Sequence, residues 1–282
     1  MREAAIVATA RTGIGKAYRG AFNDTEAPVL SSHVVNAVLD RSGIDPARVD
    51  DVYLGVGNHW NTQSYNLGRL TVHASKLPNS VGGFALDRKC SSGLNAIALA
   101  ARGVIADEID VAVAGGMETI SMTLNKFAPG WRNRSQAVID ADPYAYMAMI
   151  ETAEVVAERY GVTREAQDAF AALSQQRAGA AQAAGKFNDE IVPITVEKSL
   201  KDKEGNETGR ETVTVSADEG VRGDTTAEGL SLLRPVFKDG MVIKEGKHIT
   251  AGNASQLSDG ASAQLVMDLA TAQKEGLSVL GV

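Results

Sequence analysis

The stretch LDRKCSSGLNAIALAARGV, residues 86–104, decides the fold expected of this chain. It contains the only cysteine among the 282 residues, Cys90, followed by small residues and then by apolar residues at helical spacing. We expect a strand to end near Leu86, a tight turn to carry Cys90, and a helix to follow. Unpaired N–H groups and the dipole at a helix start stabilise a thiolate, the nucleophilic form of cysteine. A lone cysteine is more often a small buried hydrophobe, but this turn favours a reactive thiol.

Short apolar runs alternate with helical patterns on both sides of this stretch. Strands are expected at residues 4–9, 49–57, 81–87 and 109–116, with helices between them. This alternation predicts an α/β layer fold with a largely parallel sheet, in which ligands bind at the carboxyl ends of the strands. The helix after Cys90 is apolar almost all round, which predicts a helix buried on every side.

The pattern changes near residue 119. Two helices are expected at about 144–160 and 163–184, followed by two strands that form a hairpin with a charged tip. We therefore interpret residues 119–249 as an inserted α+β lobe. Residues 1–118 and 250–275 then form the first domain.

Composition excludes several classes of function. The formal net charge of −7 argues against general nucleic-acid binding and against an anionic membrane surface. No apolar run is long enough to span a bilayer, so no membrane association is expected. A single cysteine allows no internal disulfide, which favours a reducing compartment; we expect a cytoplasmic protein without a bound metal.

Three motifs carry a family resemblance. They are CSSGLNAI with Arg88 shortly before it, AGGMETIS at residues 114–121, and GNASQLSDGASA at residues 252–263. In this order and spacing they resemble the thiolases, the acyl-CoA C-acyltransferases, over essentially the whole chain. The resemblance implies a layered fold, with one βαβαβ half, a central buried helix and an inserted CoA-binding loop domain at 119–249. It also implies that residues 276–282 begin a second half, whose NEAF-like, GHP and second-cysteine motifs do not occur here. We therefore expect this chain alone to be inactive for full turnover.

The resemblance also implies an activity. Cys90 would accept the acyl group when acetoacetyl-CoA or a longer 3-ketoacyl-CoA of fatty acid metabolism is cleaved or formed. Coenzyme A would be a substrate, no cofactor would be permanently bound, and the protein would be a homodimer or homotetramer. The positions that match the family's CoA-binding and pocket residues are Arg222, Ser255, Met149 and Phe237.

Some residues depart from the family pattern. Ala148 stands where many members have a pocket histidine, Gly229 where many have a serine, and Asp87 where an asparagine is usual. Among the four histidines, only His248 is a candidate for a minor ligand contact. Acyl selectivity and hydrogen bonding to pantetheine therefore do not follow from the resemblance.

Two other readings stay open. The chain could bind CoA or acyl-CoA without turnover, or complete its site only with another chain that carries the missing half. A related condensing enzyme such as a ketoacyl synthase is disfavoured by the AGGMETIS and GNAS motifs. A half fold would leave an apolar face of the central helix exposed, which predicts a covering partner or a longer polypeptide.

Overall fold

The computed structural model describes residues 2–128 and 130–282, and its contacts divide the chain into two compact units. The first unit comprises residues up to Ala128 together with Phe187–Gly220 and Leu257–Val282. The second comprises residues 130–186 and Val221–Gln256. This division differs from the expected inserted lobe at 119–249, because the hairpin within that range packs with the first unit.

A mixed sheet forms the centre of the first unit. Its strands follow the order β1-β8-β5-β3-β4, and the short β2 pairs with the start of β8. The bounds are β1 Ala4–Arg11, β2 Gly15–Lys16, β3 Asp51–Gly55, β4 Phe84–Leu86, β5 Val111–Thr119 and β8 Ser258–Asp268. Strands β3, β4 and β5 pair in parallel, as expected, but β8 runs antiparallel between β5 and β1. The expectation of a largely parallel sheet therefore holds for β3, β4 and β5 and fails at β8.

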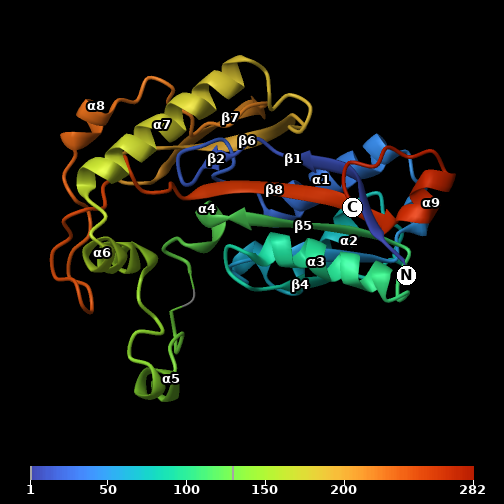
Figure 1. Ribbon diagram of the computed structural model, residues 1–282, viewed down its shortest axis with the longest axis horizontal. Coiled ribbons are helices and arrows are strands. Elements are labelled where there is room, and N and C mark those ends of the chain that lie inside the picture. The colour runs from blue at the N-terminus through green and yellow to red at the C-terminus, as the bar shows by residue number, and fades with distance from the viewer. Residues whose placement is uncertain (1, 129) are drawn as a thin grey trace. The chain divides into compact units, whose positions relative to one another are not determined.

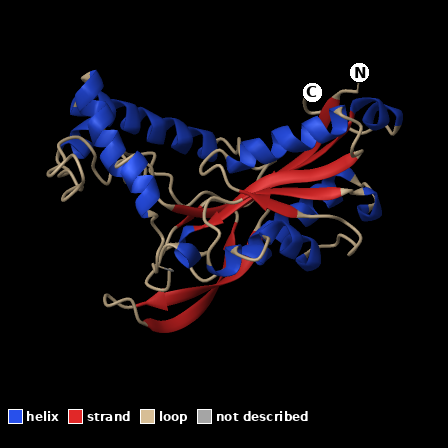
Figure 2. Cartoon of the chain, turned by 90° about the horizontal axis from the view of Figure 1, so that it is seen from below, coloured by secondary structure: helices blue, strands red, loops and turns tan. Residues whose placement is uncertain are grey.

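Helices cover both faces of this sheet (Figures 1 and 2). Helices α1, Ala27–Ser42, and α2, Leu67–Ala74, lie on one face, and α3, Ser92–Ile105, lies on the other. Successive residues of β5 point to opposite faces of the sheet. Val113 belongs to the hydrophobic cluster on the α1 side, and Ala114 belongs to the cluster on the α3 side. The two hydrophobic layers hold the carboxyl ends of β3, β4 and β5 in a fixed arrangement.

Local sequence explains the ends of α1. Pro28 occupies the first turn, where its missing N–H costs no hydrogen bond. Gly43 ends the helix with φ of +67° and donates its N–H to the carbonyl of Leu39. These are the start and stop signals that the sequence predicts.

Helix α3 packs on the sheet through one face only within the described chain. Its buried residues include Ala96, Ala100 and Val104, whereas Leu94 is 72% exposed and Ile105 is 43% exposed. The expectation of a helix buried on every side is therefore not met, and an apolar face of α3 is exposed.

The first unit also contains the hairpin of β6, Ile194–Lys201, and β7, Glu207–Val215. Apolar residues of the hairpin, such as Val196 and Val215, join the hydrophobic layer on the α1 side of the sheet. The remaining elements are the 3-10 turns η1 Pro46–Arg48 and η2 Asn61–Gln63, and the helices α4 Ile120–Thr123 and α9 Leu269–Lys274. At the end of the chain, Leu280 and Gly281 form backbone hydrogen bonds with Ile6 on the edge of β1.

The second unit is mainly helical. It contains α5 Gln136–Ala141, α6 Met149–Tyr160, α7 Arg164–Ala183 and α8 Ala227–Ser231. Thr163 caps α7 by accepting the N–H of Ala166, as its position before the helix predicts. Throughout the described residues, no helix is both long and apolar enough to cross a membrane.

Candidate active site

Cys90 is an exposed, unpaired cysteine on the turn between β4 and α3. Lys89, directly before it, has φ of +49°, a left-handed conformation that costs a non-glycine residue about 1 kcal/mol. The hydroxyl of Ser92 stabilises the turn, because it accepts the N–H of Arg88 at 2.8 Å and donates to the carbonyl of Lys89 at 2.6 Å. The predicted strand, turn and helix are all present, with Cys90 two residues before the first residue of α3.

Glycines allow α3 to begin directly against the ends of β3 and β5. A Cβ atom on Gly55 would lie 2.3 Å from the carbonyl carbon of Ser92. A Cβ atom on Gly116 would lie 3.1 Å from the Cα of Gly93. A side chain on Gly55 would push the helix start away and one on Gly116 would crowd it, so the glycines allow the close approach that places Cys90.

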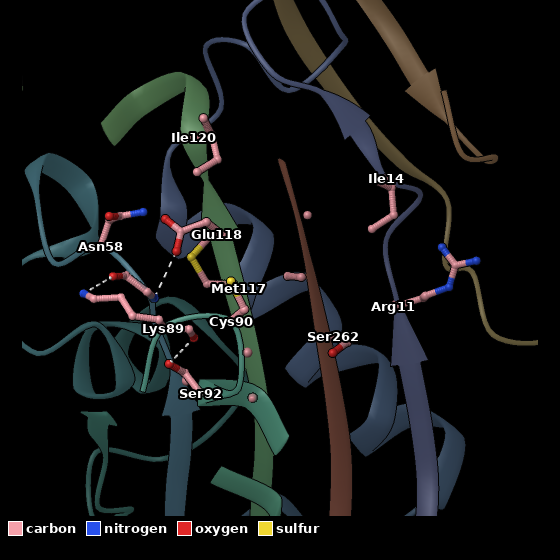
Figure 3. A pocket seen from close by; sticks show the side chains of 16 residues that line it. Arg11, Ile14, Asn58, Lys89, Cys90, Ser92, Met117, Glu118, Ile120 and Ser262 are labelled. Carbon is pink, nitrogen blue, oxygen red and sulfur yellow. Dashed lines mark hydrogen bonds between the residues drawn. The ribbon is translucent and has the colours of Figure 1, made fainter. Parts of the chain in front are cut away.

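A cavity of about 510 Å³ opens beside Cys90 at the carboxyl ends of β3, β4 and β5 (Figure 3). Its apolar side chains include Ile14, Met117 and Ile120. Its lining combines these with several polar residues and a set of glycines: Arg11, Ile14, Gly55, Gly57, Asn58, Lys89, Cys90, Ser92, Gly93, Gly116, Met117, Glu118, Ile120, Gly260, Ala261 and Ser262. The thiol therefore faces a space large enough for a small organic group.

The two cations that line the cavity are both paired. The guanidinium of Arg11 contacts Asp218 at 2.7 Å and Glu190 at 2.8 Å. The ammonium of Lys89 contacts Asp87 at 2.5 Å. Burial opposes the ionisation of Asp87, but hydrogen bonds from the side chain and the N–H of Lys89 lower its pKa below the ordinary value. Asp87 thus offsets the positive charge of Lys89, the residue before Cys90.

The four residues matched to CoA binding lie in the second unit, whereas Cys90 lies in the first. Arg222 is exposed, and its guanidinium forms no ion pair with any described residue. Its N–H donates to the side chain of Gln175 on α7. Close contact between Gly179 and Gly223 brings the loop of Arg222 onto α7, since a Cβ atom on Gly179 would lie 2.6 Å from the Cα of Gly223.

Ser255 is exposed on a loop fastened to the helices of this unit. The side chain of Asn253 donates to the buried Asp168 on α7 at 3.0 Å and to the carbonyl of His248 at 2.9 Å. The carbonyl oxygen of the same side chain accepts the N–H of Thr250. The loop that carries Ser255 is therefore ordered by its own asparagine.

The two apolar positions differ in exposure. Met149 is the first residue of α6 and is 72% exposed. Phe237 is half-buried in the loop after α8 and accepts the N–H of Gly246 at its carbonyl. His248, the one histidine kept as a candidate contact, has a buried Nδ1 without a hydrogen-bond partner among the described residues.

Sequence reasoning missed several polar residues of the cavity, among them Asn58, Glu118 and Ser262. Glu118 lies within the AGGMETIS motif, so the motif itself was the signal that could have identified it. No group of three or more histidine, cysteine, aspartate or glutamate side chains among residues 2–128 and 130–282 could hold a metal ion.

Known proteins match this chain over most of its length. The family described as "Thiolase, N-terminal domain" matches residues 4–270. The chain is 41% identical over 280 residues to peroxisomal 3-ketoacyl-CoA thiolase A of Rattus norvegicus, covering 98% of this chain and 61% of that protein. It is 40% identical over 281 residues to the 3-ketoacyl-CoA thiolase of Bacillus subtilis, covering 99% and 69%.

A solved structure agrees with the sequence matches. The acetyl-CoA acetyltransferase of Bacillus anthracis superposes with a TM-score of 0.80 at 34% identity, covering 99% of this chain and 69% of that one. The expected thiolase-like α/β fold is confirmed. The chain spans 61% to 69% of the length of these three proteins. It belongs to the thiolase family.

Proposed function

We propose that this chain is the nucleophile-bearing part of a thiolase-type acyltransferase that acts on acetoacetyl-CoA or a longer 3-ketoacyl-CoA. The observation that carries the proposal is the exposed thiol of Cys90 beside a cavity at the carboxyl ends of three parallel strands. The printed names of the relatives, 3-ketoacyl-CoA thiolase and acetyl-CoA acetyltransferase, support this substrate class.

The proposed reaction transfers an acyl group through Cys90. In cleavage, the thiolate attacks the 3-keto carbonyl, the bond between C2 and C3 breaks, and the departing acetyl-CoA takes a proton at C2. The acyl group is then a thioester on Cys90, which the thiolate of a second CoA attacks to regenerate Cys90. In the direction of synthesis, Cys90 first receives the acetyl group of acetyl-CoA and releases CoA.

Coenzyme A would be a substrate held by the second unit, with no permanently bound cofactor. An exposed guanidinium that forms no ion pair with residues 2–128 or 130–282 suits the adenine and phosphate end of CoA, which supports a role for Arg222. The exposed hydroxyl of Ser255 can donate to the pantetheine arm. We propose Met149 and Phe237 as apolar contacts for the same substrate.

We also propose a homodimer or homotetramer that works in a reducing compartment, because an exposed thiol must stay unoxidised to act as a nucleophile. We propose the cytoplasm as this compartment. The peroxisome named for the rat relative is the alternative, which fractionation of the source cells distinguishes. Sedimentation measures the oligomeric state.

Intact-protein mass spectrometry tests the proposed activity. Incubation with acetyl-CoA should add one acetyl group to the chain, and Cys90→Ser should abolish the adduct, since no other cysteine is present. Later addition of free CoA should remove the acetyl group. A stable adduct that CoA does not remove would favour an acyl-CoA-binding chain without turnover, and the absence of any adduct on correctly folded protein would contradict the proposal.

A further inference from the structure

One carboxylate faces the cavity that contains Cys90: Glu118, near the end of β5 (Figure 3). Its Oε2 accepts the N–H of Gly57 at 2.9 Å, and its Oε1 accepts the side-chain N–H of Gln63 at 2.6 Å. The other charged groups of the cavity, Arg11 and Lys89, are occupied by different acids. Glu118 is therefore held by neutral donors and not by an ion pair within the described chain.

Gln63 can present only a donor to Glu118. It is fully buried, and its carbonyl oxygen accepts the N–H of Thr119 at 2.6 Å. Its amide nitrogen donates both to Glu118 and to the carbonyl of Asn58 at 2.6 Å. Turning the amide over would place its nitrogen against the N–H of Thr119 and its oxygen against the acceptor oxygens of Glu118 and Asn58. The site thus requires two acceptor oxygens from residue 118, which a carboxylate supplies and a carboxamide does not.

Gly57 connects this carboxylate to the nucleophile. A Cβ atom on Gly57 would lie 2.8 Å from Oε2 of Glu118 and 3.9 Å from the carbonyl carbon of Lys89, which is the peptide carbon before Cys90. The carbonyl of Gly57 also accepts the ammonium of Lys89 at 3.0 Å. The backbone of Gly57 therefore lies near the peptide that precedes Cys90, and its carbonyl binds the side chain of Lys89.

That peptide needs such support, because Lys89 holds a left-handed conformation that non-glycine residues avoid. The hydroxyl of Ser92 binds the carbonyl of this peptide from the helix side, and the carbonyl of Gly57 binds the ammonium of Lys89 from the cavity side. Only the second of these supports depends on a residue distant in sequence, Glu118.

We propose that Glu118 is a positioning residue for Cys90. With Gln63 it fixes the peptide of Gly57, and Gly57 in turn holds Lys89 by its ammonium, which keeps the turn in the conformation that places the thiol at the start of α3. The consequence for acyl transfer rests on the proposed function, but the consequence for thiol reactivity does not.

The test is Glu118→Gln, an isosteric change that leaves one acceptor oxygen for two donors. Its matched control is Glu108→Gln, which removes the same charge from an exposed position of the same unit. The rate of alkylation by iodoacetamide is measured across pH, and reports on Cys90 alone because the chain has no other cysteine. Denaturant unfolding of each variant verifies that it folds.

We expect Glu118→Gln to raise the pH midpoint of alkylation by about half a unit, because a displaced thiolate loses the donors at the helix start. Loss of a negative charge alone would lower that midpoint, so the direction separates positioning from charge. Glu118→Asp keeps both acceptor oxygens, so its pH midpoint of alkylation should lie closer to that of the parent than the midpoint of Glu118→Gln does. An unchanged or lowered midpoint in folded Glu118→Gln would overturn the proposal.

Acetylation by acetyl-CoA provides the second measurement. Glu118→Gln should acetylate Cys90 about tenfold more slowly than the parent, the effect expected when one buried hydrogen bond is lost, and Glu108→Gln should match the parent. A parent that forms no adduct would contradict the proposed function, whereas the alkylation profiles would still decide the role of Glu118.

Discussion

Glu154 offers a direct test of how the second unit holds its loops. This residue of α6 is 2% exposed, and its carboxylate accepts three consecutive backbone N–H groups. They come from Lys247 at 3.0 Å, His248 at 3.1 Å and Ile249 at 2.8 Å. Because Thr250 follows directly and begins the loop that carries Ser255, we expect Glu154→Gln to loosen that loop.

The magnitude follows from counting acceptors. A glutamine side chain offers one oxygen and an NH₂ group, so at least one of the three N–H groups loses its acceptor. An unsatisfied buried donor costs about 1–3 kcal/mol. Removing the buried charge also lowers its desolvation cost, so we expect a net loss of about 2 kcal/mol in the unfolding free energy of this unit. A loss of that size makes opening of the loop roughly 30-fold more frequent.

Hydrogen exchange followed by mass spectrometry measures the effect. In Glu154→Gln, the amides of residues 247–249 should exchange roughly 30-fold faster than in the parent. The matched control is Glu158→Gln on the same helix, whose carboxylate is 59% exposed and lies 3.6 Å from the ammonium of Lys247. An exposed pair contributes little, so this control should exchange at the parental rate. Equal exchange in the two variants would refute the argument.

Two further predictions concern the helix start and acid stability. Gly55→Ala places a Cβ atom 2.3 Å from the carbonyl carbon of Ser92. It should lower the unfolding free energy by about 1–3 kcal/mol and change the rate at which Cys90 is alkylated. The control is Gly130→Ala, whose Cβ atom meets no atom within 4 Å, and equal denaturant midpoints for the two variants would count against this account. Burial disfavours ionisation of Glu151, but the N–H groups of Val242, Ile243 and Met241 lower its pKa below the ordinary 4.5. Ionised Glu151 therefore stabilises the folded protein above pH 4.5, and this stabilisation is lost as the pH falls through the lowered pKa. The unfolding free energy of the parent should fall in this acid range, and that of Glu151→Gln should not show this fall.

The sequence is informative where a structural feature depends on neighbouring residues. Pro28 and Gly43 mark the two ends of α1, and Thr163 marks the start of α7. The small residues after Cys90 indicate the turn into α3 for the same reason, since they act within one turn of chain. Strand direction at β8 could not be read in this way, because its apolar pattern fits either neighbour orientation and the pairing partner is more than 100 residues away.

The buried acids of the second unit show a different limit. Glu151 and Glu154 stand three residues apart on α6, which by itself indicates an ordinary solvated face. Both are buried because each accepts several backbone N–H groups from residues more than 90 positions later. The predicted lobe boundaries likewise differ from the two observed units, because the apolar side chains of the β6–β7 hairpin pack against the sheet of the first unit.

The start of α3 explains why the motif around Gly115 and Gly116 accompanies the cysteine. Ser91, at the N-cap, makes no side-chain capping bond, and the hydroxyl of Ser92 is used for the preceding turn. The helix start is instead located by backbone contact with glycines at the ends of β3 and β5. Glu118 follows Gly116 by two residues on β5. This short segment therefore supplies both the glycine that allows α3 to approach the strand and the carboxylate that binds the N–H of Gly57. The position of Cys90 is thus determined by two strands as much as by its own turn.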